Sequence, residues 1–353
     1  MPIRHPFRAS FFCALLLLSA TAFAQDLAQD AFNMAGLPEA QDFIHDMRDR
    51  NGMDAQDLFR RFSRLTPNAR VLRLIAPPTS PLQRSWQRYR ARFLDDIRIG
   101  KGARFWRQNA AALSRARERY GVPEEIIVAI IGIETLYGHD TGRFNTFSAL
   151  ATLAFYEPRR ADYFRQELEQ LLLLARENQR DPEHYTGSYA GALGIPQFMP
   201  GSQRRYAVDF DNDGVIDLAA SVEDAIGSVA NFLAMHGWQE GAPIAVPARL
   251  PEHLSAQKLA VWLEAGIRPA LPAKTLLDEG VVAQAQPGQI VTLVDLVTPD
   301  APTEYWLGHE NFYVITRYNR SSFYAMSVFL LAGEIKKTGD ARPGYGGKVT
   351  VEK

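Results

Sequence analysis

Hydrophobic positions recur three and four residues apart through most of the chain. Over residues 38–75 this spacing is clear in Phe43, Ile44 and Met47, and prolines 77, 78 and 81 interrupt it. Since a helix repeats every 3.6 residues, the pattern predicts amphipathic helices that pack one face on a core. The same interpretation applies to residues 103–119, 123–137, 161–177 and 311–335.

The pattern changes after Trp238. Residues 239–310 are rich in proline and carry short apolar runs such as Ile290 to Val294. These features predict a small β-rich insertion with one helix at about 255–265. The chain then returns to the helical core over residues 311–338 and ends in a C-terminal tail, residues 339–353. We therefore predict a mainly α fold, in which residues 25–238 form the main helical part.

The first 24 residues have the order of a secretory signal peptide. Basic residues at positions 4, 5 and 8 precede the apolar run Phe11–Leu18, and Ala22-Phe23-Ala24 forms a small-residue cleavage site. The run is too short to span a bilayer as a transmembrane anchor. Cys13 lies inside the run and lacks the small residues that precede a lipidation site. We therefore expect a periplasmic protein, exported by a cleaved signal peptide and without a lipid anchor.

Composition limits the remaining function classes. With 353 residues, 46% of them hydrophobic, the chain can build a large core. Removal of residues 1–24 takes away the only cysteine and two arginines, which leaves 37 basic against 40 acidic residues, a net charge of −3. Disulfide and thiol chemistry are then excluded, and no strong basic field predicts nucleic-acid binding.

One acidic residue stands out at the end of an apolar helix. Residues 123–137 read PEEIIVAIIGIETLY, with proline and two acids at the helix start and no polar face. Glu134 lies near the C-terminal end, where burial and the helix dipole both raise the pKa of a carboxyl group. A raised pKa suits a general acid. The helix alone leaves open a pair with a buried arginine, or a glutamate that reaches the surface.

Two further segments favour a binding site. The stretch 187–202, GSYAGALGIPQFMPGS, combines small residues with Ser188 and Gln197, which can hydrogen-bond sugar hydroxyls or amides. Tyr318-Asn319 and Tyr324 offer aromatic faces for sugar rings and an amide for an N-acetyl group. Taken alone, the first segment could be a structural loop and the second an ordinary amphipathic helix.

Residues 209–217 match the first part of an EF-hand calcium loop. Asp209, Asp211, Asp213 and Asp217 occupy loop positions 1, 3, 5 and 9, and Gly214 occupies position 6. The backbone carbonyl of Val215 would be the ligand at position 7. Acids that converge in this way repel one another unless a cation lies between them, and hard oxygen ligands favour Ca²⁺ over Zn²⁺. The alternative is an acidic surface turn, because position 12 is Ala220 where the motif has Glu.

Together these segments resemble the B-type membrane-bound lytic murein transglycosylases (glycoside hydrolase family 103), from about Leu37 to Ala332. The diagnostic segments, in order, are IIGIETLYG at 130–138, RRADYFRQEL at 159–168, GSYAGALGIPQFMP at 187–200, AVDFDNDGVIDL at 207–218, DAIGSVANFLAMHGW at 224–238 and NFYVITRYNRSSFYAM at 311–326.

The resemblance implies a lysozyme-like core with an additional α domain, a deep groove, and Glu134 as the acid/base. It also implies a longer calcium loop closed by Asp224, with Glu223 as a substitute. The family's saccharide- and muropeptide-binding positions match Tyr89, Arg159, Arg160, Ser188, Gln197, Phe232, Tyr318, Asn319 and Tyr324. Phe232 departs from the tyrosine common at its position, so a hydroxyl contact there is in doubt.

The implied function is cleavage of the β-1,4 bond between MurNAc and GlcNAc in peptidoglycan, with 1,6-anhydro-MurNAc ends, in cell-wall turnover. The implied partners are glycan strands and muropeptides, together with cell-wall synthesis or hydrolysis proteins; the expected cofactor is structural calcium and no organic group. A hydrolytic muramidase would need a second carboxylate, for which Asp140 and Glu157 are the candidates. A non-catalytic peptidoglycan-binding protein, and a calcium-dependent adhesion module, are the alternatives outside enzymes.

Overall fold

The computed structural model describes residues 33–77 and 84–340 of the 353 residues. The predicted signal peptide, Cys13 and most of the predicted C-terminal tail lie outside these ranges. The described chain divides into two compact units. The first comprises residues 33–76, 144–185 and 189–191, and the second comprises residues 77, 84–143, 186–188 and 192–340.

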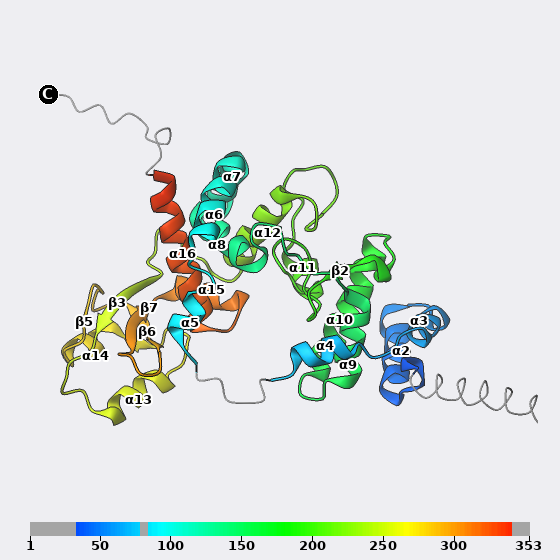
Figure 1. Ribbon diagram of the computed structural model, residues 1–353, viewed down its shortest axis with the longest axis horizontal. Helices are drawn as coiled ribbons and strands as arrows, with labels where there is room; N and C mark the ends of the chain where they lie inside the picture. Colours follow the sequence, from blue (N-terminus) through cyan, green and yellow to red (C-terminus); the bar gives the residue numbers. More distant parts are fainter. Residues whose placement is uncertain (1–32, 78–83, 341–353) are drawn as a thin grey trace, which may run out of the picture. The chain divides into compact units, whose positions relative to one another are not determined.

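The first unit is helical and has an aromatic core. Phe62 meets the rings of Phe43, Phe147 and Phe155 at centroid distances of 6.0, 5.3 and 5.8 Å. Helix starts carry side-chain caps, such as Asp54, whose carboxylate accepts two backbone N–H groups. Its elements are η1 (Met34–Gly36), α2 (Pro38–Asn51), α3 (Ala55–Ser63), α4 (Ala69–Ile75), β1 (Phe144–Asn145), α9 (Thr146–Tyr156), α10 (Ala161–Glu177) and η2 (Pro182–His184) (Figure 1).

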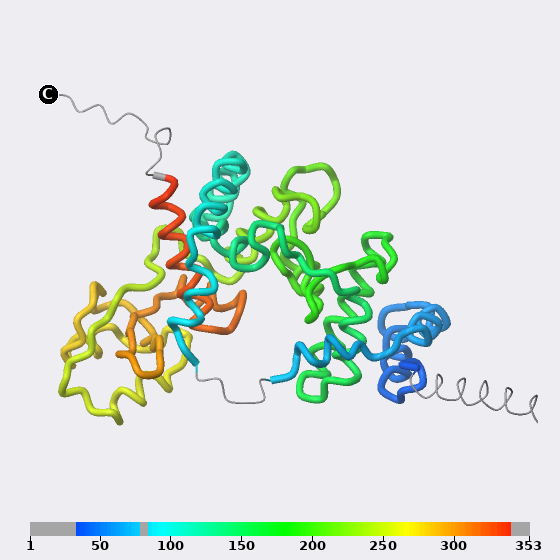
Figure 2. Tube along the Cα trace, in the orientation of Figure 1, coloured from blue at the N-terminus to red at the C-terminus, as the bar shows by residue number. Residues whose placement is uncertain are grey.

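The second unit is built around one helix with a long apolar run, α8 (Glu124–Thr135). Against it pack α6 (Asp96–Gln108), α7 (Ala110–Tyr120), α12 (Val222–Met235) and α16 (Ser322–Asp340). Figure 2 shows how segments far apart in sequence, cyan α6 and red α16, come together there. This unit also contains α5 (Trp86–Arg90), α11 (Pro200–Tyr206), α15 (Glu310–Tyr318) and the short strand β2 (Thr186–Gly187).

A five-stranded antiparallel sheet occupies the segment that the sequence marks as β-rich. Its strands are β3 (Ala245–Arg249), β4 (Leu271–Pro272), β5 (Val282–Ala283), β6 (Ile290–Leu296) and β7 (Glu304–Gly308), in the order β4-β6-β7-β3-β5. Helices α13 (Ala256–Glu264) and α14 (Ala273–Asp278) contribute Trp262 and Leu276 to its small core. The predicted helix at 255–265 corresponds to α13.

The predicted mainly α class with a small β part is confirmed. Three helix predictions were wrong in their continuity or extent. The stretch 103–119 is divided between α6 and α7 at Asn109, whose side chain donates to the carbonyl of Phe105 (2.8 Å). The stretch 311–335 is divided at Asn319, which is extended (φ −147°, ψ 121°). Helix α16 runs to Asp340, beyond the predicted start of the tail at 339.

Among the described residues, no helix combines the length and the apolar composition needed to cross a membrane.

Candidate active site

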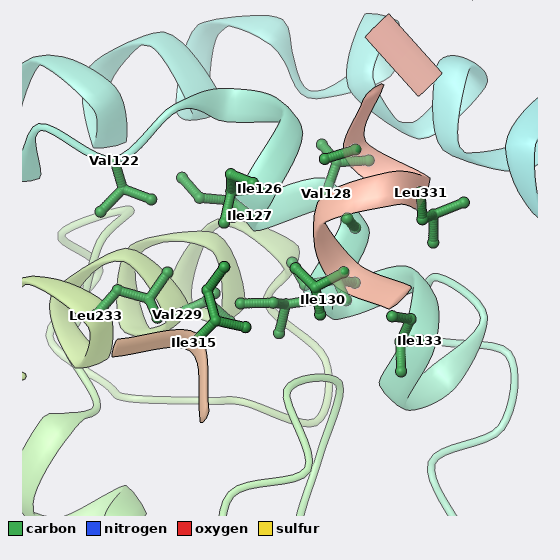
Figure 3. Close-up of a cluster of buried hydrophobic side chains, with 14 of the residues drawn as sticks. Val122, Ile126, Ile127, Val128, Ile130, Ile133, Val229, Leu233, Ile315 and Leu331 are labelled. Atoms are coloured by element: carbon green, nitrogen blue, oxygen red, sulfur yellow. The ribbon is translucent and has the colours of Figure 1, made fainter. Parts of the chain in front are cut away.

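Helix α8 carries one acidic side chain, Glu134, directly after the apolar run of residues 126–133. Its isoleucines lie among side chains of α12, α15 and α16, including Val229, Ile315 and Leu331 (Figure 3). The helix ends at Thr135, and the chain then reverses through Leu136 and Tyr137, both at positive φ. Glu134 therefore stands in the last turn, where the helix leaves the core.

Glu134 is half-buried, and its Oε1 accepts a hydrogen bond from the hydroxyl of Tyr324 (2.6 Å). Burial raises the pKa of Glu134 from 4.5 to about 7, while the Tyr324 hydrogen bond opposes part of that rise. No described cation forms an ion pair with this carboxyl group, so an arginine partner does not account for Glu134 in this part of the chain. A carboxyl group with this pKa can both donate and accept a proton near neutrality.

Aromatic side chains from several helices surround the carboxyl group. The ring of Tyr324 on α16 stacks on Tyr318 of α15, with centroids 6.3 Å apart and an interplanar angle of 12°. Burial and the charge of Glu134 raise the pKa of both hydroxyls well above the usual value for tyrosine. Burial and the charge of Glu134 also raise the pKa of Tyr89, which lies on α5. The three tyrosines thus share an environment with Glu134.

Phe232 supports this aromatic wall from behind. It is 5% exposed, and its ring lies 4.9 Å from that of Tyr318 and 4.1 Å from that of His236. The buried ring serves as packing for Tyr318. Asn319, by contrast, is exposed at the end of α15.

The segment 187–200 contacts the end of α8, where the hydroxyl of Thr135 donates to the carbonyl of Ile195. Gln197 has a φ of 51°, and its Nε2 donates to the carbonyls of Thr141 (3.1 Å) and Gly194 (2.9 Å). The two bonds fix the amide and leave its oxygen without a partner among the described residues. The hydroxyl of Ser188 accepts from the N–H of Ala192 (3.0 Å). Gly194 is required because a Cβ there would overlap the carbonyl of Leu218, so its small size serves chain packing.

Thr135, which the sequence pattern did not single out, ties this segment to α8. It is 1% exposed, and its hydroxyl donates to the carbonyl of Ile195 (2.8 Å) and accepts from the N–H of Gly138 (3.0 Å). One side chain thereby fixes the residue after Glu134 relative to the residues before Gln197. The only sequence signal was a polar residue directly after the candidate acid.

Arg159 and Arg160 belong to the first unit, where both are exposed. The guanidinium of Arg159 pairs with Glu157 (2.7 Å), and that of Arg160 lies over the ring of Tyr163 (4.6 Å). Arg159 lowers the pKa of Glu157, which is therefore ionised near neutrality and poorly suited as a second acid. Asp140 is exposed in the turn after α8, and its N–H donates to the carbonyl of Thr135.

The acidic loop divides into two groups of residues. Carboxylate oxygens of Asp209, Asp211 and Asp213 lie within 4.8 Å of one another, a donor set that suits a hard cation. Asp224 is 0% exposed and points elsewhere: its two oxygens accept the N–H groups of Phe210 (2.7 Å) and Asp217 (2.8 Å). Its carboxylate therefore braces the two ends of the loop.

Asp217 and Val215 complete the loop. An oxygen of Asp217 accepts from the N–H groups of Ala219 and Ala220, so it caps the turn that leads to α12. Val215 is exposed, and its N–H donates to Asp213 (2.8 Å).

Comparison with known proteins identifies the family of the chain. Residues 36–333 match the family described as the transglycosylase SLT domain. The chain belongs to that family. It is 43% identical over 310 residues to membrane-bound lytic murein transglycosylase B of Escherichia coli, which covers 85% of this chain and 83% of that protein.

Two solved structures share the fold. The soluble lytic transglycosylase SltB1 of Pseudomonas aeruginosa has a TM-score of 0.79 at 43% identity, over 86% of this chain and all of that one. The lytic transglycosylase Slt35 of Escherichia coli, in complex with calcium, has a TM-score of 0.76 at 40% identity, over 86% and 95% of the two chains. The protein is accordingly an enzyme, a lytic transglycosylase of peptidoglycan with a lysozyme-like fold.

The raised pKa of Glu134 makes the stability of this transglycosylase depend on pH. Between pH 4.5 and about 7 the folded protein keeps a proton that the unfolded chain has released, so the free energy of unfolding falls as pH rises. Glu134→Gln removes this cost. We expect the variant to gain up to about 3 kcal/mol over the unmutated protein at pH 8, and to lose that advantage below pH 4.5, in denaturant unfolding.

Glu157→Gln is the matched control because the pKa of Glu157 is shifted in the opposite direction, downward, by Arg159. Its substitution should cost more stability at neutral pH than at acid pH. An equal effect of Glu134→Gln at both pH values would contradict a carboxyl group held protonated by burial.

The Thr135 link gives a second expectation. Thr135→Val keeps the shape of the side chain but leaves the carbonyl of Ile195 and the N–H of Gly138 without their partner. We expect a loss of about 2 kcal/mol in unfolding free energy and of roughly tenfold in kcat, whereas Thr135→Ser should retain both. Denaturant unfolding and muropeptide release measure the two effects; a valine variant with unchanged kcat would exclude a role in aligning the site.

Proposed function

We propose that Glu134 is the single acid/base of this lytic transglycosylase. The supporting observation is the half-buried carboxyl group with a pKa of about 7, held at one oxygen by Tyr324. Of the described acids, Glu134 is the one whose charge raises the pKa of Tyr89, Tyr318 and Tyr324. The two candidates for a second carboxylate have other roles, because Glu157 pairs with Arg159 and Asp140 lies exposed in a turn.

The Tyr324 hydrogen bond defines which oxygen reacts. Since the hydroxyl donates to Oε1, the proton of the neutral acid resides on Oε2. That proton passes to the oxygen between MurNAc and GlcNAc as the bond to C1 of MurNAc breaks. The N-acetyl carbonyl of MurNAc stabilises the positive charge at C1.

The second half of the reaction returns the proton. Glu134, now a carboxylate, removes the proton from the C6 hydroxyl of the same MurNAc, and the C6 oxygen bonds to C1. A 1,6-anhydro ring forms, Glu134 is protonated again, and water is not consumed. One group suffices for both steps because a pKa near 7 makes both forms available at neutral pH.

The surrounding residues orient the sugar. The amide oxygen of Gln197 and the hydroxyl of Tyr324 face the N-acetyl group, while Ser188 and Asn319 supply further polar contacts to the saccharide. Tyr89 and Tyr318 offer ring faces, and Phe232 shapes the wall behind Tyr318. We also assign Arg159 and Arg160 to the binding of anionic groups of muropeptides, since both guanidinium groups are exposed.

The acidic loop is proposed to hold Ca²⁺ in a structural role. Asp209, Asp211, Asp213 and the carbonyl of Val215 would be ligands, with Asp217 completing the set and Asp224 bracing it. A related structure contains calcium. The end of the loop is joined to the residues before Gln197 because the N–H of Ile195 donates to the carbonyl of Leu218 (2.8 Å). A bound ion would therefore stabilise the segment that carries Gln197.

The N-terminal sequence supports a cellular location for the enzyme. We propose a periplasmic enzyme of cell-wall turnover, exported by residues 1–24 and free of a lipid anchor, which acts on glycan strands and muropeptides. The order of basic, apolar and small residues at the N-terminus supports this setting.

Digestion of purified peptidoglycan tests the catalytic proposal. We expect the protein without residues 1–24 to release muropeptides that are lighter than hydrolysis products by one water, as measured by mass spectrometry. Glu134→Gln should reduce their release at least about a thousandfold, since both proton transfers are lost. Asp140→Asn and Glu157→Gln should retain the products.

Two results would overturn this proposal. Hydrated reducing ends would identify a hydrolytic muramidase. Full activity of Glu134→Gln would place the acid elsewhere.

Calcium addition to chelator-treated protein tests the loop. At a hundred times the dissociation constant, an ion that binds only the folded state adds about 2.7 kcal/mol to the unfolding free energy. Asp211→Asn should weaken this response, whereas Asp162→Asn, at an exposed acid outside the loop, should not. Equal responses of the two variants would exclude the loop as the site.

A further inference from the structure

The backbone behind Glu134 adopts an unfavourable conformation. Leu136, Tyr137 and Gly138 follow one another at φ values of 50°, 65° and 84°. Residues with a Cβ lose roughly 1–2 kcal/mol each in this left-handed region. Leu136 closes α8 directly after Thr135, so the orientation of the last helical turn, with Glu134, depends on contacts that hold this reversal.

Tyr137 supplies the first of these contacts. Its side chain folds back between α8 and α6, and its hydroxyl donates to the carbonyl of Arg98 (2.9 Å). The phenol occupies space left by two glycines. A Cβ on Gly132 of α8 would lie 2.5 Å from its oxygen, and a Cβ on Gly102 of α6 would overlap the same atom. The ring meets Phe105 at 5.4 Å.

Arg98 supplies the second contact, at the C-terminal end of α8. Its Nε donates to the carbonyl of Gly132 (3.1 Å), which also accepts the N–H of Leu136. Its Nη1 donates to the carbonyl of Arg92 (2.5 Å) and to Asp95 (3.0 Å). A cation at a helix C-terminus is also favoured by the helix dipole. Arg98 thus binds Tyr137 through its backbone and α8 through its side chain.

Arg98 also contacts the aromatic pair Phe93 and Tyr89. The guanidinium of Arg98 lies over the ring of Phe93 (5.3 Å), and Phe93 packs against Tyr89 (5.3 Å). The charge of Arg98 does not account for the raised pKa of Glu134, because burial raises that pKa and the Tyr324 hydrogen bond opposes part of the rise. The effect of Arg98 on Glu134 is therefore one of geometry.

We infer that Tyr137 and Arg98 form a latch that holds the left-handed turn and thereby directs Oε2 of Glu134 at the glycosidic oxygen. Both are positioning residues, and the inference rests on Glu134 as the proposed acid/base. Tyr324 binds only Oε1 of Glu134. Rotation of the carboxyl group and displacement of the last helical turn must therefore be limited by the backbone that follows Glu134.

Tyr137→Phe tests the latch with the smallest change. The ring stays in the space between the two glycines, and only the hydrogen bond to Arg98 is lost. We expect kcat on soluble peptidoglycan fragments to fall roughly tenfold, with KM within about twofold because the binding residues are untouched. The products should remain anhydro muropeptides.

Tyr120→Phe is the matched control. The hydroxyl of Tyr120 on α7 is buried and has no hydrogen-bond partner in the described part of the chain. Its removal should leave kcat, KM and the unfolding temperature unchanged or the temperature slightly raised. A comparable loss of kcat in this variant would mean that any buried tyrosine hydroxyl matters and would overturn the latch.

Leu136→Gly separates positioning from stability. Glycine adopts the left-handed conformation freely, so the strain is relieved, but the turn becomes free to take other conformations. We expect kcat to fall while the unfolding temperature falls less than in Thr135→Val. If Tyr137→Phe does not fold, this variant decides the question.

The outcomes distinguish the latch from the proposed function. Inactive Glu134→Gln together with fully active Tyr137→Phe and Leu136→Gly would exclude the latch and leave the catalytic role of Glu134 intact. Active Glu134→Gln would exclude the catalytic role itself. Losses of kcat that follow the losses of stability in every variant would show that the contacts only support the fold.

Discussion

The carboxyl group of Glu134, near the end of an apolar run, sets the requirements for the packing around it in the second unit. Transfer of that group from water to the helix end is unfavourable unless it is protonated, which gives it a pKa of about 7. The isoleucines of α8 provide the apolar environment. Tyr324 satisfies one oxygen, so the other is available for chemistry. The packing around Glu134, its hydrogen bond to Tyr324 and its raised pKa therefore depend on the same arrangement of side chains.

The contacts that hold Glu134 in place act on the end of α8 and the turn that follows it, residues 132–138. Thr135 fixes the turn to the segment with Gln197, and the acidic loop braces that segment through Leu218. Helix α6 reaches the same turn through Arg98, whose carbonyl accepts from the hydroxyl of Tyr137 and whose Nε donates to the carbonyl of Gly132. Each support comes from a different stretch of sequence, so the conformation of the turn depends on the folded second unit as a whole.

The sequence predicted those features that depend on local pattern. The apolar faces, the α8 isoleucines and the β-rich segment follow from spacing and composition, and Glu134 was conspicuous because its helix has no other charged residue beyond the first turn. The breaks at Asn109 and Asn319 escaped because their neighbours keep helical spacing. Tyr137 and Arg98 escaped because their partners, two glycines and a backbone carbonyl, leave no periodic signal.

The separation of Glu134 and Tyr324 along the chain has a consequence for folding. Tyr324 lies 190 residues after Glu134, and residues 144–185 of the first unit intervene before Gln197. Contacts across such distances form late, since long loops must close first. A chain that has emerged only as far as α12 lacks Tyr324 and the whole of α16. Because the proposed site needs both residues, cutting activity is expected only when nearly the entire polypeptide has folded.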